Sequence, residues 1–213
     1  MPSPLLSEVR FGSYLVYSPR GTSETSVKSR RLRDAVKGGD AGTLRNIAEH
    51  IAANFASSGL AGVLGADVTL VPCPRSSPLV EGALWPGRLL ADELVRVGLA
   101  RQVIVCVERI AAVPKSAFAS PGSRPNALKH YETIRASADL AATGRITLVD
   151  DFVTKGNTLL GAATRLAEAY AGATVTTFAA VRTKGLQPDV EALVEPCVGR
   201  IWERSFGEAD REP

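Results

Sequence analysis

The sequence lacks any long apolar run. No window approaches the roughly 18 uninterrupted apolar residues that indicate a membrane-spanning helix. The amino terminus, Met-Pro-Ser-Pro-Leu-Leu-Ser-Glu, also lacks the charged stretch and apolar core that together make a secretory signal. We therefore expect a soluble, untargeted protein that has no membrane partner.

Cysteine is scarce as well. Cys73, Cys106 and Cys197 are odd in number, far apart and without a Cys-x-x-Cys pair, which argues against a disulfide framework and against a zinc ribbon. A reducing cytoplasm is the default location for such a chain. Cys106 lies in an apolar run, so we expect a small core residue there and not a nucleophile.

Neither sign of charge dominates the composition. The chain has 25 basic and 22 acidic residues, which leaves a formal net charge of +3. Such a mild excess suits an enzyme for anionic substrates about as well as weak contact with nucleic acid, and it decides neither.

The length and the hydrophobic pattern favour one α/β domain. The chain has 213 residues, of which 45% are hydrophobic, enough for a single sizeable core. Strands are predicted at residues 11–17, 67–72, 103–107, 146–149 and 173–181. Helices are predicted at residues 26–37, 44–55, 83–97 and 158–171, with a short one at 190–194. This alternation predicts a parallel sheet, and the continuous apolar run at 103–107 predicts a strand covered on both faces.

Two adjacent carboxylates follow the predicted strand at 146–149. If that strand is central and parallel, its carboxyl end opens onto the crevice where such sheets bind ligands, and Asp150 and Asp151 lie there. Carboxylates suit hydroxyl donors or a hydrated metal ion. In the following residues, 154–158, Gly156 allows the chain to curl so that several N–H groups converge at a helix start, which favours a phosphate. Sugar hydroxyls beside a phosphate describe a ribose 5-phosphate.

A second candidate anion site follows the predicted strand at 67–72. The loop reads Cys-Pro-Arg-Ser-Ser-Pro and presents Arg75, Ser76 and backbone N–H groups at the carboxyl end of a strand. Prolines are common in turns after strands, so this loop alone is a weak signal.

The segment at 113–135 departs from the alternating pattern. Its prolines and glycine predict a long irregular stretch, which inside a compact domain is typical of a lid or a binding loop. An ordinary solvent-exposed excursion is the alternative. The candidate lid residues are basic: Lys115, Arg124, Lys129 and His130.

The predicted helix at 26–37 is also basic. Such a charge run is usually a solvated helix face, and contact with nucleic acid or a substrate phosphate is the alternative. The cations concerned are Lys28, Arg30, Arg31 and Arg33.

The stretch Val-Asp-Asp-Phe-Val-Thr-Lys-Gly-Asn-Thr resembles the signature of type I phosphoribosyltransferases, which has an apolar strand, an acid pair, a hydroxyl residue, Gly and a closing Thr or Ser. Looser matches are similar to the ComF-like branch of that family and extend the resemblance over roughly residues 27–183. They are Leu-Arg-Asp-Ala-Val-Lys-Gly-Gly-Asp, Leu-Val-Pro-Cys-Pro-Arg-Ser and Ser-Arg-Pro-Asn.

The resemblance implies a type I phosphoribosyltransferase-like α/β fold, in which helices flank a central parallel sheet and a small hood is built from the N- and C-terminal segments. Residues 1–213 would form one domain with a core at about 40–183, and residues 1–39 and 184–213 would be accessory elements. Proteins of this fold often form homodimers.

It also implies a ligand, phosphoribosyl pyrophosphate or a nucleotide monophosphate. Asp150 and Asp151 would contact the ribose hydroxyls. Arg75 would act with them in catalysis, as a part of the pyrophosphate loop. That loop comprises Cys73, Pro74, Arg75 and Ser76, and the 5-phosphate loop comprises Thr154, Lys155, Gly156, Asn157 and Thr158. Mg²⁺ would be held near the acids through substrate and water, without direct protein ligands.

Two alternatives to a phosphoribosyltransferase stay open. One is a non-catalytic regulatory protein of the same fold that senses a nucleotide or binds nucleic acid, and the other is an α/β domain whose acids merely cap a loop. The chain has no zinc ribbon of the kind that often precedes ComF-like domains, Lys155 stands where a small hydroxyl residue is common, and no base-recognition element is identifiable. The acceptor base or amine is therefore not predicted.

Overall fold

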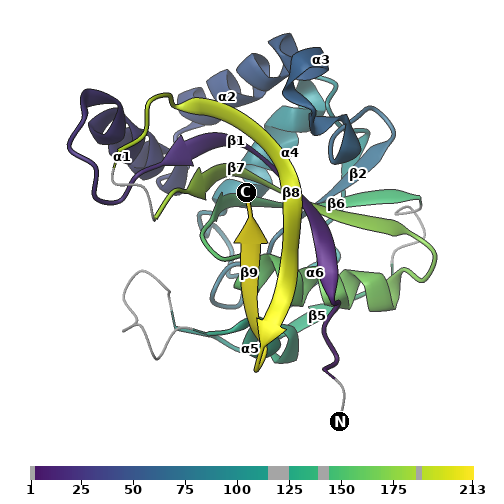
Figure 1. Cartoon of the computed structure of the whole chain (residues 1–213). Helices are drawn as coiled ribbons and strands as arrows, with labels where there is room; N and C mark the ends of the chain where they lie inside the picture. The colour runs from purple at the N-terminus through teal and green to yellow at the C-terminus, as the bar shows by residue number, and fades with distance from the viewer. Residues whose placement is uncertain (1–2, 115–124, 139–143, 186–188) are drawn as a thin grey trace.

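The structure is a computed structural model that describes residues 3–114, 125–138, 144–185 and 189–213. A seven-stranded sheet runs through the molecule, with helices on both of its faces (Figure 1). In spatial order its strands are β3 (Gln102–Val103), β2 (Val68–Pro72), β6 (Arg145–Val153), β7 (Thr174–Thr183), β1 (Glu8–Tyr17), β8 (Val194–Ser205) and β9 (Glu208–Glu212). The two strands β4 (Val107–Arg109) and β5 (Ile134–Ala136) form a separate antiparallel pair.

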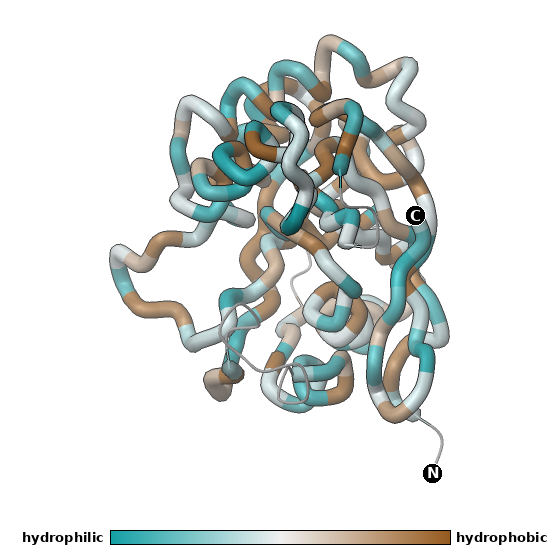
Figure 2. Tube along the Cα trace, turned by 60° about the vertical axis from the view of Figure 1, so that its left-hand side comes forward, coloured by the Kyte–Doolittle hydropathy of each residue, from teal (hydrophilic) through white to brown (hydrophobic). Residues whose placement is uncertain are grey.

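The helices are α1 (Glu24–Lys37), α2 (Ala41–Ala53), α3 (Phe55–Ser58), α4 (Pro86–Arg96), α5 (Ala127–Glu132) and α6 (Asn157–Ala169), with a 3-10 turn at Leu60–Gly62. Of these, α5 and α6 cover one face of the sheet and α1, α2 and α4 cover the other. The helices carry both hydrophilic and hydrophobic residues (Figure 2), as expected for helices that bury one side. On α4, for example, Leu90, Ala91 and Leu94 are buried.

The parallel part of the sheet comprises β3, β2, β6, β7 and β1, with β6 between β2 and β7. In β6, Ile146 and Leu148 lie in the core under α6, and Val149 lies in the core under α4. A strand that is apolar toward both faces is typical of a covered parallel sheet. The predicted α/β architecture, with a central parallel sheet flanked by helices, is thus confirmed.

Both chain ends contribute strands to this central sheet. β1 pairs in parallel with β7 and antiparallel with β8, and β8 pairs with β9. The predicted core at 40–183 with accessory segments at 1–39 and 184–213 stays a prediction, but strands from both accessory segments join the central sheet. The physical reason is that β1 completes the hydrogen bonding of β7, which would otherwise be an open edge.

The predicted strand at 103–107 is wrong. β3 ends at Val103, and β4 begins at Val107 in the separate pair with β5. Val105 between them is 47% exposed, so the run is not covered on both faces. It lies at the edge of the sheet, where Cys106 and Val107 turn into the core under α6. Periodicity alone does not distinguish such a crossing from a central strand.

The predicted short helix at 190–194 is also wrong. Val16 N donates to Leu193 O at 2.9 Å, and β8 begins at Val194. Pairing with β1 takes the backbone groups that a helix would use internally. In the described parts of the chain, no helix has both the length and the apolar character needed to cross a membrane.

Candidate functional site

The acid pair lies near the carboxyl end of the central strand β6. Asp150 pairs with Ala179 of β7, so the strand continues further than the predicted 146–149. Successive residues of a strand point to opposite faces, which directs Asp150 toward Cys73 and Asp151 toward α1. Asp151 N donates to Asp150 Oδ1 at 2.9 Å. The two carboxylates thus form one unit at the sheet edge where parallel α/β proteins bind ligands.

The electrostatics of the pair favour a cation or hydroxyl donors as ligands. Burial raises the pKa of Asp150 well above its usual range, and the charge of Asp151 raises it further. The pKa of the neighbouring Cys73 thiol is likewise raised, by burial and by the charge of Asp150. Ionisation of Asp150 and of Cys73 is therefore disfavoured in the free protein, and pKa shifts of this kind are common at functional sites.

Lys37 is a site residue that the sequence analysis missed. Its Nζ lies 3.0 Å from Asp151 Oδ2 and 5.1 Å from the ring centroid of Phe152. Burial alone would lower the pKa of Lys37, but the charges of Asp151 and Asp150 outweigh it and leave the pKa raised. In the sequence, the only indication of Lys37 is its position at the end of the basic helix, before Gly38 and Gly39. That this helix end lies against the acid pair is visible only in the structure.

The loop at 154–158 leads from β6 into α6. Gly156 has a φ of +96°, the left-handed region, and it occupies the N-cap position, so no side chain caps the helix there. A Cβ on Gly156 would lie 2.7 Å from Ile201 Cγ2. Glycine is therefore required both by its conformation and by its packing. Among the described residues, no side chain caps the first turn of α6, as an anion site needs.

The hairpin of β8 and β9 braces this loop from one side. Arg211 Nε donates to Thr154 O at 3.0 Å, and Ala209 N donates to Asn157 Oδ1 at 2.6 Å. Lys155 Nζ lies 3.8 Å from Glu208 Oε2. The carboxamide of Asn157 is thus engaged in holding the hairpin, which leaves its backbone N–H as the group for a ligand. No pattern in the sequence predicted that the β8–β9 hairpin would contact this loop.

The loop after β2 lies beside the acid pair. Cys73 N donates to Val149 O at 2.7 Å, and Trp85 Nε1 donates to Cys73 O at 2.8 Å. Cys73 and Pro74 are buried, whereas Arg75 and Ser76 are partly exposed. The guanidinium of Arg75 makes no ion pair with any described residue, so it is available to an anion.

Two of the four candidate lid residues, Lys115 and Arg124, lie outside the described residues. The other two belong to α5, so the described part of 113–135 is not the irregular stretch that was predicted. Lys129 Nζ is 3.5 Å from Glu132 Oε2, and its side chain is 55% exposed. His130 is only 4% exposed, which differs from the exposed position expected on a lid. It is packed because Gly161 of α6 lets α5 approach closely.

His130 connects the N-terminus of α6 to Arg109 of β4, another residue that the sequence analysis missed. Arg109 Nη2 lies 3.0 Å from His130 Nδ1, and His130 Nε2 lies 3.2 Å from Thr158 Oγ1. Arg109 Nε donates to Arg75 O at 2.9 Å. Burial, together with the charge of Arg109, lowers the pKa of His130 to about 3. A buried cation thus contacts both candidate anion loops, one directly and one through a neutral histidine.

The basic face of α1 is largely engaged in local contacts. Lys28 Nζ lies 2.6 Å from Glu24 Oε1, Arg33 Nη2 lies 2.7 Å from Asp34 Oδ1, and Arg30 Nη1 donates to Gly21 O at 2.7 Å. Such contacts are typical of a solvated helix face.

The chain matches no protein-family model, and no curated protein matches it either. In the described residues, no group of three or more His, Cys, Asp or Glu side chains is arranged to hold a metal ion. The two carboxylates at 150 and 151 nevertheless offer oxygen donors of the kind that suits Mg²⁺ bound largely through water and substrate.

Proposed function

We propose that this protein is a Mg²⁺-dependent phosphoribosyltransferase of the type I fold, ComF-like branch, that uses phosphoribosyl pyrophosphate. The observation that carries the proposal is the acid pair on β6, which leads directly into the uncapped N-terminus of α6. One short loop therefore separates the carboxylate oxygens, which can accept hydrogen bonds from ribose hydroxyls, from the backbone N–H groups, which can donate to a phosphate.

Each part of the ligand has residues of matching chemistry in this proposal. Asp150 and Asp151 accept hydrogen bonds from the ribose hydroxyls, and the backbone of residues 154–158 binds the 5-phosphate. Arg75 and Ser76 bind the pyrophosphate in this proposal, and the hydrogen bond from Cys73 N to Val149 O holds their loop beside the acids. Mg²⁺, when bound through water and substrate near the acids, supplies positive charge to the pyrophosphate.

The reaction is displacement of pyrophosphate at the anomeric carbon by a base or an amine that is not identified. The bond from that carbon to the pyrophosphate oxygen breaks, and the bond to the acceptor forms. As positive charge develops on the ribose, the carboxylates of Asp150 and Asp151 stabilise it, and Arg75 stabilises the departing negative charge. In the free protein the carboxylate of Asp151 is already paired with Lys37. When the ligand binds, this ion pair must therefore break, or Asp151 must contact Lys37 and the ligand at the same time.

A second candidate is a regulatory protein of the same fold that binds a nucleotide, or nucleic acid, without catalysis. The Lys37–Asp151 ion pair favours it, because a ligand that competes for Asp151 would shift the end of α1. Binding to DNA or RNA with steep salt dependence, unchanged in Asp150→Asn, would support this candidate over catalysis.

The exposed apolar residues Leu79, Val80 and Leu84 line a hollow of about 450 Å³ in the segment that follows the pyrophosphate loop. Exposed apolar patches are typical of interaction sites, which supports the further proposal of a homodimer. Cys73, Cys106 and Cys197 form no disulfide with any described residue, as suits a cytoplasmic protein. Light scattering after size exclusion tests the oligomeric state.

The activity test is incubation of isotope-labelled phosphoribosyl pyrophosphate with pooled nucleobases and amines, with and without Mg²⁺. We expect Mg²⁺-dependent release of pyrophosphate in at least one pool. The Asp150→Asn and Asp151→Asn double variant should lose it, whereas Asp92→Asn, which changes only an exposed pair with Arg88 on α4, should keep it. Absence of release across every pool would count against catalysis and leave the regulatory candidate.

A further inference from the structure

The two candidate anion loops are joined by a buried chain of side chains. Arg109 is 4% exposed, and its guanidinium donates to Arg75 O at 2.9 Å and to Thr133 Oγ1 at 2.6 Å. On the other side it contacts His130, which in turn contacts Thr158 in the first turn of α6. Neither Arg109 nor His130 has a role in the function proposed above.

The direction of each hydrogen bond in this chain is fixed by chemistry. A guanidinium only donates, so His130 Nδ1 accepts from Arg109. The imidazole is then neutral and carries its hydrogen on Nε2, which donates to Thr158 Oγ1 at 3.2 Å. Because that oxygen is used as an acceptor here, the hydroxyl hydrogen of Thr158 remains to be donated to another group. The pKa of about 3 for His130 agrees with the neutral ring.

Among the described residues, no carboxylate balances the charge of Arg109. Its partners are a carbonyl, a hydroxyl and an imidazole, and it forms no ion pair within the described residues. An unpaired charge is costly to bury, and burial lowers the pKa of Arg109. Such a cation gains stability when an anion binds near it, and Arg109 contacts the loop at Arg75 directly and the loop at Thr158 through His130.

We propose that Arg109 and His130 are positioning residues, which orient the hydroxyl of Thr158 as a hydrogen-bond donor to a phosphate monoester bound at residues 154–158. Arg109 polarises His130, and His130 holds Thr158 in the donating orientation, so that part of the buried positive charge acts on the phosphate. This inference rests on the proposed function, because it assumes that the loop binds the 5-phosphate.

The test is calorimetric titration of the full chain with ribose 5-phosphate, and separately with inorganic pyrophosphate. His130→Phe keeps a flat aromatic ring of somewhat larger size and removes both hydrogen bonds, and Thr158→Val removes the hydroxyl with little change in shape. We expect each to weaken ribose 5-phosphate binding roughly tenfold, as for a lost hydrogen bond to a charged group. The affinity for pyrophosphate should change less than about threefold in Thr158→Val.

Two further variants separate positioning from loss of structure. In His130→Gln the amide oxygen and nitrogen have about the spacing of the two ring nitrogens, so it should restore binding to within about threefold of the wild type. The double variant His130→Phe/Thr158→Val should be no weaker than about tenfold, because both changes break one pathway. If His130→Phe does not fold, the test rests on Thr158→Val and its matched control Thr158→Ser. Because Thr158→Ser keeps the hydroxyl, it should bind ribose 5-phosphate more tightly than Thr158→Val.

The outcomes separate this inference from the proposed function. If the wild type binds no ribose 5-phosphate, the proposed function is overturned and this inference with it. If the wild type binds but Thr158→Val and a folded His130→Phe bind equally well, only the positioning role is overturned. Losses that multiply to roughly a hundredfold in the double variant would also overturn it, because the two residues would then act independently.

Discussion

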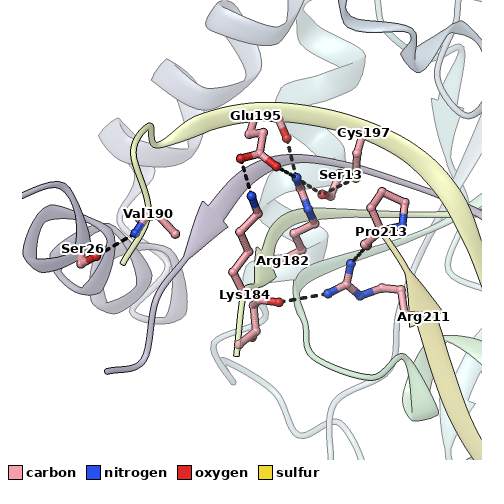
Figure 3. A network of polar contacts seen from close by, with 10 residues as sticks. Ser13, Ser26, Arg182, Lys184, Val190, Glu195, Cys197, Arg211 and Pro213 are labelled. Carbon is pink, nitrogen blue, oxygen red and sulfur yellow. Dashed lines mark hydrogen bonds and ion pairs between the residues drawn. The ribbon is translucent and has the colours of Figure 1, made fainter. Parts of the chain in front are cut away.

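Two arginines in the described chain are almost fully buried, and they differ in how their charge is balanced. Arg182 of β7 is 2% exposed, and its Nη2 lies 2.5 Å from Glu195 Oε1 of β8 (Figure 3). It also donates to Ser13 Oγ at 3.1 Å and to the backbone oxygen of Glu195. Arg109, by contrast, is 4% exposed and contacts only neutral groups among the described residues.

The difference separates a structural charge from one that is available to a ligand. Glu195 satisfies Arg182 and also pairs with Lys184 Nζ at 2.6 Å, which fastens β8 to the sheet. Arg109 has no such internal counter-ion in the described residues. It contacts the loop at Arg75 directly and the loop at Thr158 through His130. A buried cation whose partners are neutral is costly unless an anion binds near it, so its charge is available to an external anion.

The largest effects are expected from Arg109→Gln and Arg182→Gln. Arg109→Gln should weaken binding of phosphoribosyl pyrophosphate by about a hundredfold, because both anion loops lose their support. Arg182→Gln should leave binding within about threefold but lower the free energy of unfolding by about 2 kcal/mol, since it removes charge-assisted hydrogen bonds to the half-exposed Glu195 and to Ser13. Calorimetry and urea unfolding on both variants measure the two quantities. If the two variants changed ligand affinity and the free energy of unfolding by the same amounts, the distinction between the two arginines would be wrong.

The second prediction concerns acid sensitivity. The pKa of His130 falls from 6.5 to about 3 on folding, so the unfolded chain takes up this proton first as the pH falls. The stability that His130 contributes is complete above about pH 6.5 and is lost toward pH 3, by about 1.4 kcal/mol per pH unit. Urea unfolding from about pH 7 to pH 4 should therefore show a shallower decline for His130→Gln. Parallel declines would mean that His130 is not buried in the neutral form.

The third prediction is that Asp150→Asn stabilises the free protein. The pKa of Asp150 is raised on folding, so the unfolded chain loses this proton first as the pH rises, and the folded state loses stability above pH 3.8. Asparagine removes the ionisation, and we expect a gain of about 1–2 kcal/mol at pH 7, with ligand binding reduced. Asp151→Asn serves as the control, because it breaks the ion pair with Lys37 and should give no gain. A loss of stability in Asp150→Asn would contradict the raised pKa.

The smallest effect is expected at Lys155. Its ammonium is 3.8 Å from Glu208, and its side chain is 58% exposed. Exposed pairs contribute about 0–1 kcal/mol, so Lys155→Ala should change phosphate affinity less than about threefold. A tenfold loss by calorimetry would instead make Lys155 a direct phosphate ligand.

The sequence was sufficient to predict the local parts of the site. Asp150, Asp151 and Gly156 lie together in one strand–loop–helix segment, where short-range pattern and chain geometry coincide. The parallel sheet followed from the alternation of apolar runs with amphipathic helices. These features depend on neighbours in the chain, which a pattern can represent.

The residues that were missed reach the site only through packing between distant segments. Lys37 comes from α1, Arg109 from β4 and Arg211 from β9. Arg109 and Arg211 lie in no local motif, and Lys37 lies in the matched stretch 32–40 without any local sign of its partner. The structure places each against a segment far away in the sequence. The wrong strand at 103–107 has a related cause, since whether an apolar run is central or at an edge depends on its partners in the sheet.

The central claim is that the acid pair and the loop at residues 154–158 bind a phosphorylated ribose with Mg²⁺. Calorimetric titration with phosphoribosyl pyrophosphate, with and without Mg²⁺, tests it most directly. We predict saturable, Mg²⁺-dependent binding by the wild type and by Asp92→Asn, and at least a hundredfold loss in the Asp150→Asn/Asp151→Asn double variant. Absence of binding by the wild type, or equal binding by the double variant, would contradict the claim.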